Sequence, residues 1–179
     1  MHTAIAALDT LVREHGRKEV TLSIAGSTSD VRYLAELESW IAARDLQGRT
    51  RFLGMLDRHE LIRAYGEHDI QLFPSIWEEP FGIVRLEAMA SGLPVVSTRT
   101  GAAEEVHQHG ETGLFFTAED PESCAREVLR LLDEPDLFGG IRERSRQEIE
   151  ERYQLGRVMD SLESLLFEAA TGRGQTPRC

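Results

Sequence analysis

The sequence predicts an α/β domain built on a doubly wound parallel sheet. Short apolar runs alternate with longer segments in which apolar residues recur at helical spacing, and parallel strands need such helical crossovers to return the chain. The chain has 179 residues, of which 41% are hydrophobic. That length is enough for one globular domain with its own core, but not for two.

The predicted strands are short runs of aliphatic, β-branched or aromatic residues, which is typical of strands buried on both faces of a sheet. They cover residues 20–25, 50–53, 70–73, 94–97 and 114–116. Because helical segments separate them, we expect all five to be parallel and helices to cover both faces of the sheet.

The predicted helices are placed by apolar spacing and by residues that favour helix ends. The first covers residues 3–15, carries Ile5, Leu8 and Val12 on one face, and ends at Gly16. The next three are expected from a cap at Asp30 to before Gly48, over 57–66, and from near Gly82 to about Ser91.

A later helix begins at a cap near Asp120 or Pro121, and the residues expected on its buried face are Cys124, Val128, Leu131 and Leu132. Two more helices close the chain. We therefore place the domain at residues 1–170. Residues 171–179, which contain two Gly and one Pro, are predicted to be a disordered tail.

Composition excludes several classes of protein. The formal net charge is −11 and Lys18 is the only lysine, which argues against a basic surface for nucleic acid. No apolar stretch reaches the roughly 18 to 20 residues that cross a bilayer, and the first residues lack the pattern of a signal peptide. We expect a cytoplasmic protein with Cys124 and Cys179 as free thiols.

The candidate site is the segment that follows the strand at 70–73. It runs as Pro-Ser-Ile-Trp-Glu-Glu-Pro-Phe-Gly-Ile-Val-Arg-Leu-Glu from residue 74 to residue 87. Ligands of open parallel sheets bind beyond the carboxyl ends of strands, and free amides at a helix start receive anions. Glu79 lies on the loop and Glu87 lies one turn beyond Ile83, so two carboxylates can bind sugar hydroxyls around a diphosphate. Taken singly, each Glu is better explained as a charge that complements the helix dipole.

The whole string resembles the signature of family 4 retaining glycosyltransferases of the GT-B class, in which two Glu are separated by seven residues. Residues 80–86, Pro-Phe-Gly-Ile-Val-Arg-Leu, closely match the usual Gly-Phe-Gly-Leu-Val-x-Leu of that family. The resemblance extends over residues 4–155 and includes Phe52-Leu53-Gly54, Glu87 to Val96, Gly101 to Glu105 and Gly110 to Leu114. One departure is Ala102, which stands where the family usually has a second glycine.

The resemblance implies a Rossmann-like, C-terminal donor-binding domain that transfers sugar from a nucleotide-diphosphate sugar. It implies that Glu79, the catalytic residue, binds the hydroxyls of the donor sugar and that Glu87 binds the ribose hydroxyls. It implies that main-chain amides of the donor site come from Phe81, Gly82, Ile83 and Val84. It also implies that Met55 and Leu56 border the nucleobase. UDP, GDP and ADP sugars remain open. The family keeps the anomeric configuration and needs no metal or other cofactor, and the chain has no Asp-x-Asp triplet.

Other candidates are weaker. Gly26 is expected to form a turn beside the sugar nucleotide, because the segment 26–29 lacks the glycine pattern of an NAD site. His107 and His109 lack a third metal ligand, so we interpret them as solvent-facing residues. Trp77 either stacks on a sugar or packs on its neighbours.

The resemblance also implies parts that this chain does not show. Family members carry an N-terminal acceptor-binding domain, a linker, and a central strand with an Arg and a Lys-Gly pair that hold the donor diphosphate. Lys18 lies beyond the first helix and does not match that pair. In the strand order 3-2-1-4-5-6, the strands at 20–25 and 70–73 would flank the absent first strand.

Two hypotheses follow. In the first, the chain is the donor domain of an intact two-domain enzyme and is inactive alone. In the second, it is a module that binds only nucleotide sugar or a partner subunit. In either case, unpaired inner strand edges predict marginal stability or a strand borrowed from a partner.

Overall fold

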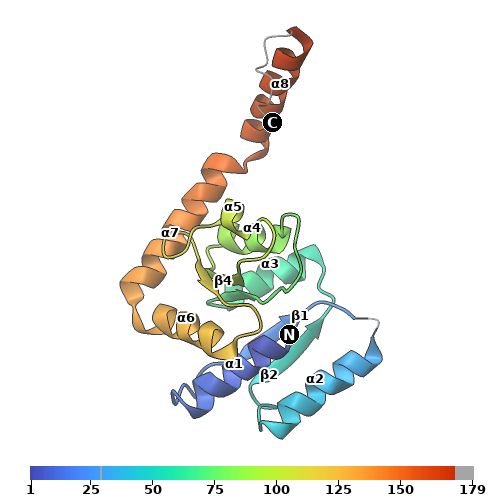
Figure 1. Cartoon of the computed structure of the whole chain (residues 1–179), viewed down its shortest axis with the longest axis vertical. Coiled ribbons are helices and arrows are strands. Elements are labelled where there is room, and N and C mark those ends of the chain that lie inside the picture. Colours follow the sequence, from blue (N-terminus) through green and yellow to red (C-terminus); the bar gives the residue numbers. More distant parts are fainter. Residues whose placement is uncertain (29, 172–179) are drawn as a thin grey trace.

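A computed structural model describes residues 1–28 and 30–171, and strands alternate with helices along them (Figure 1). The strands are β1 (Leu22–Ala25), β2 (Thr50–Gly54), β3 (Gln71–Phe73), β4 (Val95–Thr98) and β5 (Leu114–Phe116). The helices are α1 (His2–Arg13), α2 (Val31–Ala43), α3 (Arg58–Glu67), α4 (Ile83–Ala90), α5 (Ala103–Val106), α6 (Pro121–Asp133), α7 (Pro135–Arg152) and α8 (Leu155–Thr171). The predicted elements are confirmed within a few residues, and α5 is an addition that the sequence did not predict.

The strands form two separate parallel sheets. One sheet has the order β1-β2 and the other has the order β3-β4-β5. No strand of the described chain joins β1 to β3, which is where the family resemblance implied a missing central strand. The fold expectation is therefore confirmed, while marginal stability stays a prediction.

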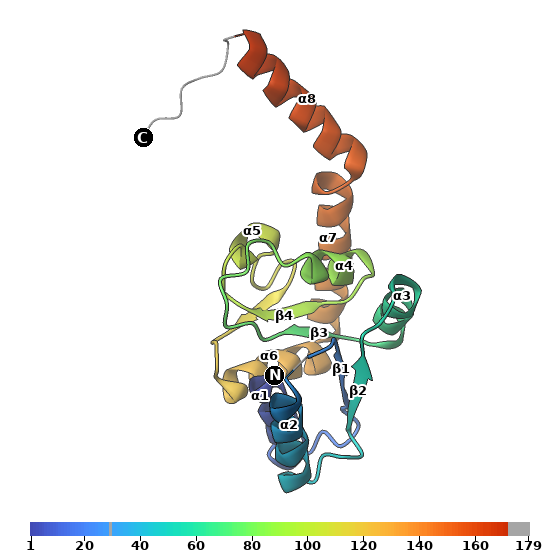
Figure 2. The same ribbon diagram turned by 90° about the vertical axis from the view of Figure 1, so that its right-hand side faces the viewer.

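Helix α1 packs into both sheets. Ile5 and Leu8 belong to a buried cluster with side chains of α2, β1 and β2. Ala7 and Leu11, on another side of the same helix, belong to a cluster with α6, β4 and β5. Figure 2 shows α1 and α6 beneath β3 and β4, with the β1-β2 pair to their right. The burial of α1 therefore holds the two sheets together where no ladder of backbone hydrogen bonds does.

Aspartate side chains cap the N-termini of α2 and α6, as the sequence predicted. Asp30 accepts from the amides of Arg32 and Tyr33, at 3.0 and 3.1 Å, and Asp120 accepts from Ser123 at 2.9 Å. Each bond satisfies an amide that has no partner within its helix. The prediction for the buried face of α6 is wrong at one residue. Cys124, Val128 and Leu131 are buried as predicted, but Leu132 is 36% exposed. The buried face turns instead toward Ser123 and Glu127.

The C-terminal helix α8 extends away from the rest of the molecule (Figures 1 and 2). All of its residues are exposed, including several large apolar ones. The predicted tail at 171–179 lies outside the described residues except for Thr171, which ends α8. Cys124 is a buried free thiol, whereas Cys179 lies outside the described part.

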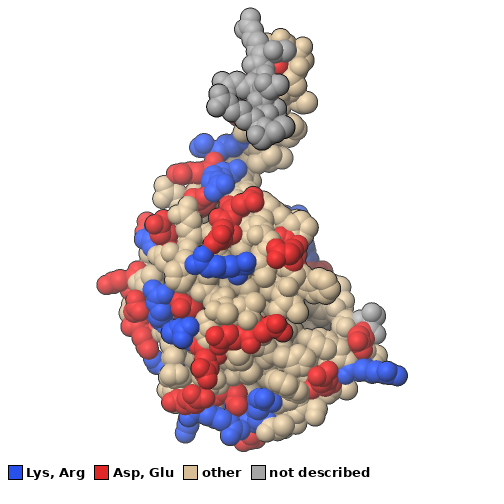
Figure 3. Space-filling view, in the orientation of Figure 1, with Lys and Arg blue, Asp and Glu red and all other residues tan. Residues whose placement is uncertain are grey.

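The surface carries charges of both signs. In Figure 3, blue Lys and Arg side chains lie among red Asp and Glu side chains over the described residues of that face. No helix in the described part of the chain combines the length and the apolar character that crossing a bilayer requires.

Candidate functional site

The predicted site residues lie at the carboxyl ends of three strands. Gly26 directly follows β1, Leu56 lies two residues beyond β2, and the loop from Pro74 to Gly82 joins β3 to α4. Gly26 has φ 130°, and its amide donates to the carbonyl of Gly54 at 2.8 Å. This bond links the ends of β1 and β2. The positive φ requires glycine at this turn.

The start of α4 is open to a ligand. Gly82 is the N-cap residue, with φ 71° and ψ 60°, and no described side chain caps the helix. Ile83 is 64% exposed and Val84 is 40% exposed. The first amides of a helix have no partner within it, and they carry the positive end of the helix dipole. An anion can therefore bind at this helix start.

Glu79 is held by the loop that follows β4. Its backbone carbonyl accepts from the amide of Ala102 at 3.1 Å, and its side chain accepts from the Ser75 hydroxyl at 3.4 Å. The neighbouring Glu78 accepts from the amide of Gly101 at 2.7 Å. These bonds fix the loop before α4, so that Glu79 stays half-buried next to the helix start.

Gly101 and Ala102 explain the departure from the family pattern. Gly101 has φ 56°, which favours glycine. Ala102 has φ −76°, which any residue adopts, and its amide still donates to Glu79. The alanine at this position therefore still forms a backbone hydrogen bond with the loop that carries Glu79.

Glu87 lies within α4, on the helix side of the open amides. One of its carboxylate oxygens accepts from the Tyr65 hydroxyl at 3.4 Å. Burial raises the pKa of Tyr65, and the nearby Glu87 carboxylate raises it further. Tyr65 therefore stays a neutral donor that orients Glu87, while the carboxylate itself remains exposed.

Arg85 is a residue of this region that the sequence interpretation missed. Its side chain is fully buried (0% exposed), with its guanidinium 4.9 Å from the centre of the Phe73 ring. Its Nη2 donates to the Phe81 carbonyl at 3.0 Å. The available signal was its position three residues before Ala88 and four before Met89, which places it on the buried face of α4.

The histidine interpretation needs one correction. His107 is 2% exposed, with Nε2 lying 3.2 Å from the Ser97 hydroxyl and its ring stacked on Phe115. It was wrong to interpret His107 as solvent-facing, because its neighbours enclose it. His109 is exposed, and its Nδ1 accepts from the amide of Phe115 at 2.9 Å. Within the described residues, no group of three or more His, Cys, Asp or Glu side chains is arranged to hold a metal ion.

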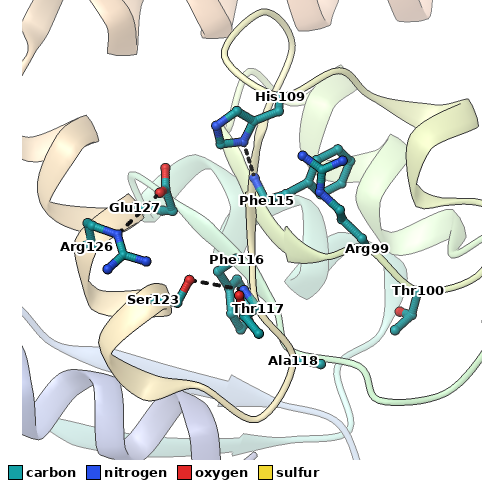
Figure 4. Close-up of a pocket in the computed structure, with 10 residues that line it drawn as sticks. All are labelled: Arg99, Thr100, His109, Phe115, Phe116, Thr117, Ala118, Ser123, Arg126 and Glu127. Carbon is teal, nitrogen blue, oxygen red and sulfur yellow. Dashed lines mark hydrogen bonds and ion pairs between the residues drawn. The ribbon is translucent and has the colours of Figure 1, made fainter.

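A pocket of about 550 Å³ lies outside the candidate site, and Figure 4 shows the residues that line it. It is lined by residues after β4, such as Arg99, by His109 before β5, by β5 itself and the residues after it, and by α6 residues such as Arg126 and Glu127. None of the predicted site residues lines it. Trp77, close to Glu79 in the sequence, is 76% exposed.

Known proteins resemble the chain in sequence and in fold. The family model of glycosyl transferases group 1 matches residues 1–152. Glycogen synthase of Mycobacterium tuberculosis is 31% identical over 179 residues, which cover 98% of this chain and 41% of the synthase. N-acetyl-alpha-D-glucosaminyl L-malate synthase of Bacillus anthracis is 32% identical over 123 residues, covering 69% of this chain and 32% of that enzyme.

Two solved structures give the same result for the fold. HepE of Anabaena, solved in complex with UDP and glucose, has a TM-score of 0.85 at 24% identity and covers 94% of this chain and 44% of its own. The C-terminal domain of the group 1 family protein LpcC of Francisella tularensis has a TM-score of 0.76 at 24% identity, covering 86% and 79%.

The fold is therefore that of the C-terminal domain of GT-B glycosyltransferases. The chain belongs to the family of glycosyl transferases group 1, also called family 4. It spans about two fifths of the length of the glycogen synthase and of HepE.

Proposed function

We propose that the chain is the donor-binding domain of a retaining glycosyltransferase that transfers sugar from a nucleotide-diphosphate sugar to an acceptor. The observation that carries the proposal is the open start of α4, with Glu79 before it and Glu87 within it. In this proposal the amides of Ile83 and Val84 receive the diphosphate. Glu79 binds the donor-sugar hydroxyls at the reacting centre, and Glu87 binds the ribose hydroxyls.

The remaining predicted residues complete the donor site in this proposal. Leu56, with Met55, borders the nucleobase, and Gly26 forms the turn beside it. Phe81 and Gly82 shape the loop that approaches the diphosphate. No metal ion and no organic cofactor take part, as in the family that the chain resembles. The complex of HepE with UDP and glucose supports a nucleotide-sugar ligand.

Titration with UDP-glucose, GDP-mannose and ADP-glucose in a calorimeter tests the proposal. We expect saturable binding of one of these ligands, because the helix start and the two carboxylates lie on a loop held by several hydrogen bonds. If the folded chain bound none of the three ligands, the assignment of a donor site would be contradicted.

We predict that Glu87→Ala weakens binding of that ligand by about 1 to 3 kcal/mol, the usual value of a hydrogen bond to a charged group. Calorimetry measures the loss of affinity. Glu143→Ala, which removes an exposed carboxylate on α7, is the matched control and should leave the affinity unchanged. Equal affinities of the two variants would show that Glu87 does not bind the ribose.

We also predict that the isolated chain transfers no sugar. The chain spans 44% of HepE, and transfer needs an acceptor site and a water-excluding closure between domains. A radiolabelled donor incubated with common acceptors measures this. Labelled product from the chain alone would show that one domain suffices.

A further inference from the structure

Arg85 is a buried cation with unsatisfied hydrogen-bonding groups. Its Nε and Nη1 have no hydrogen-bond partner among the described residues. Of the described Arg and Lys side chains, it alone is fully buried. An unpaired buried charge costs stability, and proteins seldom keep one without a use for it. Arginine also remains protonated in proteins, so the charge persists.

The guanidinium lies directly beneath the bend that begins α4. A Cβ atom at Gly82 would lie 2.7 Å from both Nε and Nη2 of Arg85, so the glycine backbone rests against the charged group. Nη2 also holds the carbonyl of Phe81. Arg85 therefore supports the two residues that lead into the open amides of Ile83 and Val84.

Two ionisable neighbours define the electrostatics around Arg85. Burial lowers the pKa of Arg85, and the nearby Glu79 carboxylate opposes that shift. No ion pair joins the two side chains within the described residues. Burial, followed by the charge of Arg85, lowers the pKa of His107 to about 3, so His107 is neutral near neutral pH. Arg85 therefore provides the buried positive charge beneath the loop.

We propose that Arg85 is a positioning residue of the donor site, whose guanidinium holds the Gly82 bend and places a positive charge beneath the amides that receive the donor diphosphate. This inference rests on the proposed function. Among the described residues the charge lacks a full partner, and a bound diphosphate would supply the opposite charge across the loop. A buried charge such as that of Arg85 attracts an opposite charge more strongly than an exposed one, because water screens it less.

The test compares Arg85→Met with Arg85→Lys, and Arg146→Met, at an exposed position of α7, is the control. The ligands are the nucleoside diphosphate that the wild-type chain binds and the corresponding nucleoside monophosphate. We expect Arg85→Met to weaken diphosphate binding by about tenfold and monophosphate binding less. Arg85→Lys should restore most of the affinity.

Thermal unfolding of the same variants separates this role from a structural one. Removal of an unpaired buried charge should leave the Tm of Arg85→Met unchanged or raise it, while the diphosphate affinity falls. Unchanged diphosphate affinity would overturn the inference, as would equal losses for both ligands together with a lower Tm. A wild-type chain that binds no nucleotide would overturn the proposed function as well.

Discussion

Gly101→Ala is expected to destabilise the domain by at least about 2 kcal/mol and to abolish donor binding, because the left-handed backbone strains any other residue. The φ of Gly101 is 56°, and an added Cβ would lie 2.7 Å from the carbonyl carbon of Glu79 and closer still to its oxygen. The loop that carries Glu79 would have to move. Urea unfolding measures the stability, and calorimetry measures the binding.

The control for this variant is Gly139→Ala. Gly139 lies within α7, where an added Cβ would meet nothing within 4 Å. Alanine is the better helix former there, so this change should be neutral or stabilise the domain by up to about 1 kcal/mol. If Gly101→Ala matched the control in stability and in ligand affinity, the contact between Gly101 and Glu79 would have no part in the site.

Acidification from pH 7.5 is expected to destabilise the domain through His107. Burial, followed by the charges of Arg85 and His109, lowers the pKa of His107 from 6.5 to about 3. Below pH 6.5, therefore, His107 is protonated in the unfolded chain but stays neutral in the folded chain. The contribution of His107 to the free energy of unfolding is fully present above pH 6.5 and is lost progressively as the pH drops toward 3. At about 1.4 kcal/mol per pH unit, the loss is about 2 kcal/mol at pH 5 and about 5 kcal/mol at pH 3.

The pH experiment isolates His107 by comparing variants. Urea unfolding of the wild-type chain, of His107→Gln and of His59→Gln, an exposed position in α3, is measured at pH 7.5 and at pH 5. The carboxylates titrate in all three chains, so the difference between them reports on the histidines. His107→Gln should lose less stability on acidification than the other two. Identical pH dependence in all three chains would contradict burial of a neutral His107.

The sequence predicted the strands, because short apolar runs are local signals. The strand order implied by the family resemblance placed an absent strand between β1 and β3, and no described strand joins the two there. The loop from Glu79 to α4 was predicted from its residue spacing. The roles of Glu79, Glu87, Leu56 and Gly26 in ligand binding stay predictions.

The sequence did not predict which polar residues would be buried. Arg85 and His107 are polar by type, and their burial depends on contacts with Phe73 and Phe115, which lie on other elements, β3 and β5. Periodicity likewise placed Leu132 on the buried face of α6, although the packing of α6 leaves it exposed. Tertiary packing decides such cases, and one sequence does not report it.

The position of α1 between the sheets has a mechanical consequence for the proposed site. The β1-β2 pair carries Gly26 and Leu56, on the proposed nucleobase side, while the other sheet carries Glu79 and Glu87. Since no described strand ties these halves together, the thickness of the side chains on α1 sets the spacing between them. Ile5 and Ala7 lie in the two buried clusters on either side of α1. A change in the size of either side chain should therefore alter the distance between the two halves of the proposed site, although neither residue belongs to the site itself.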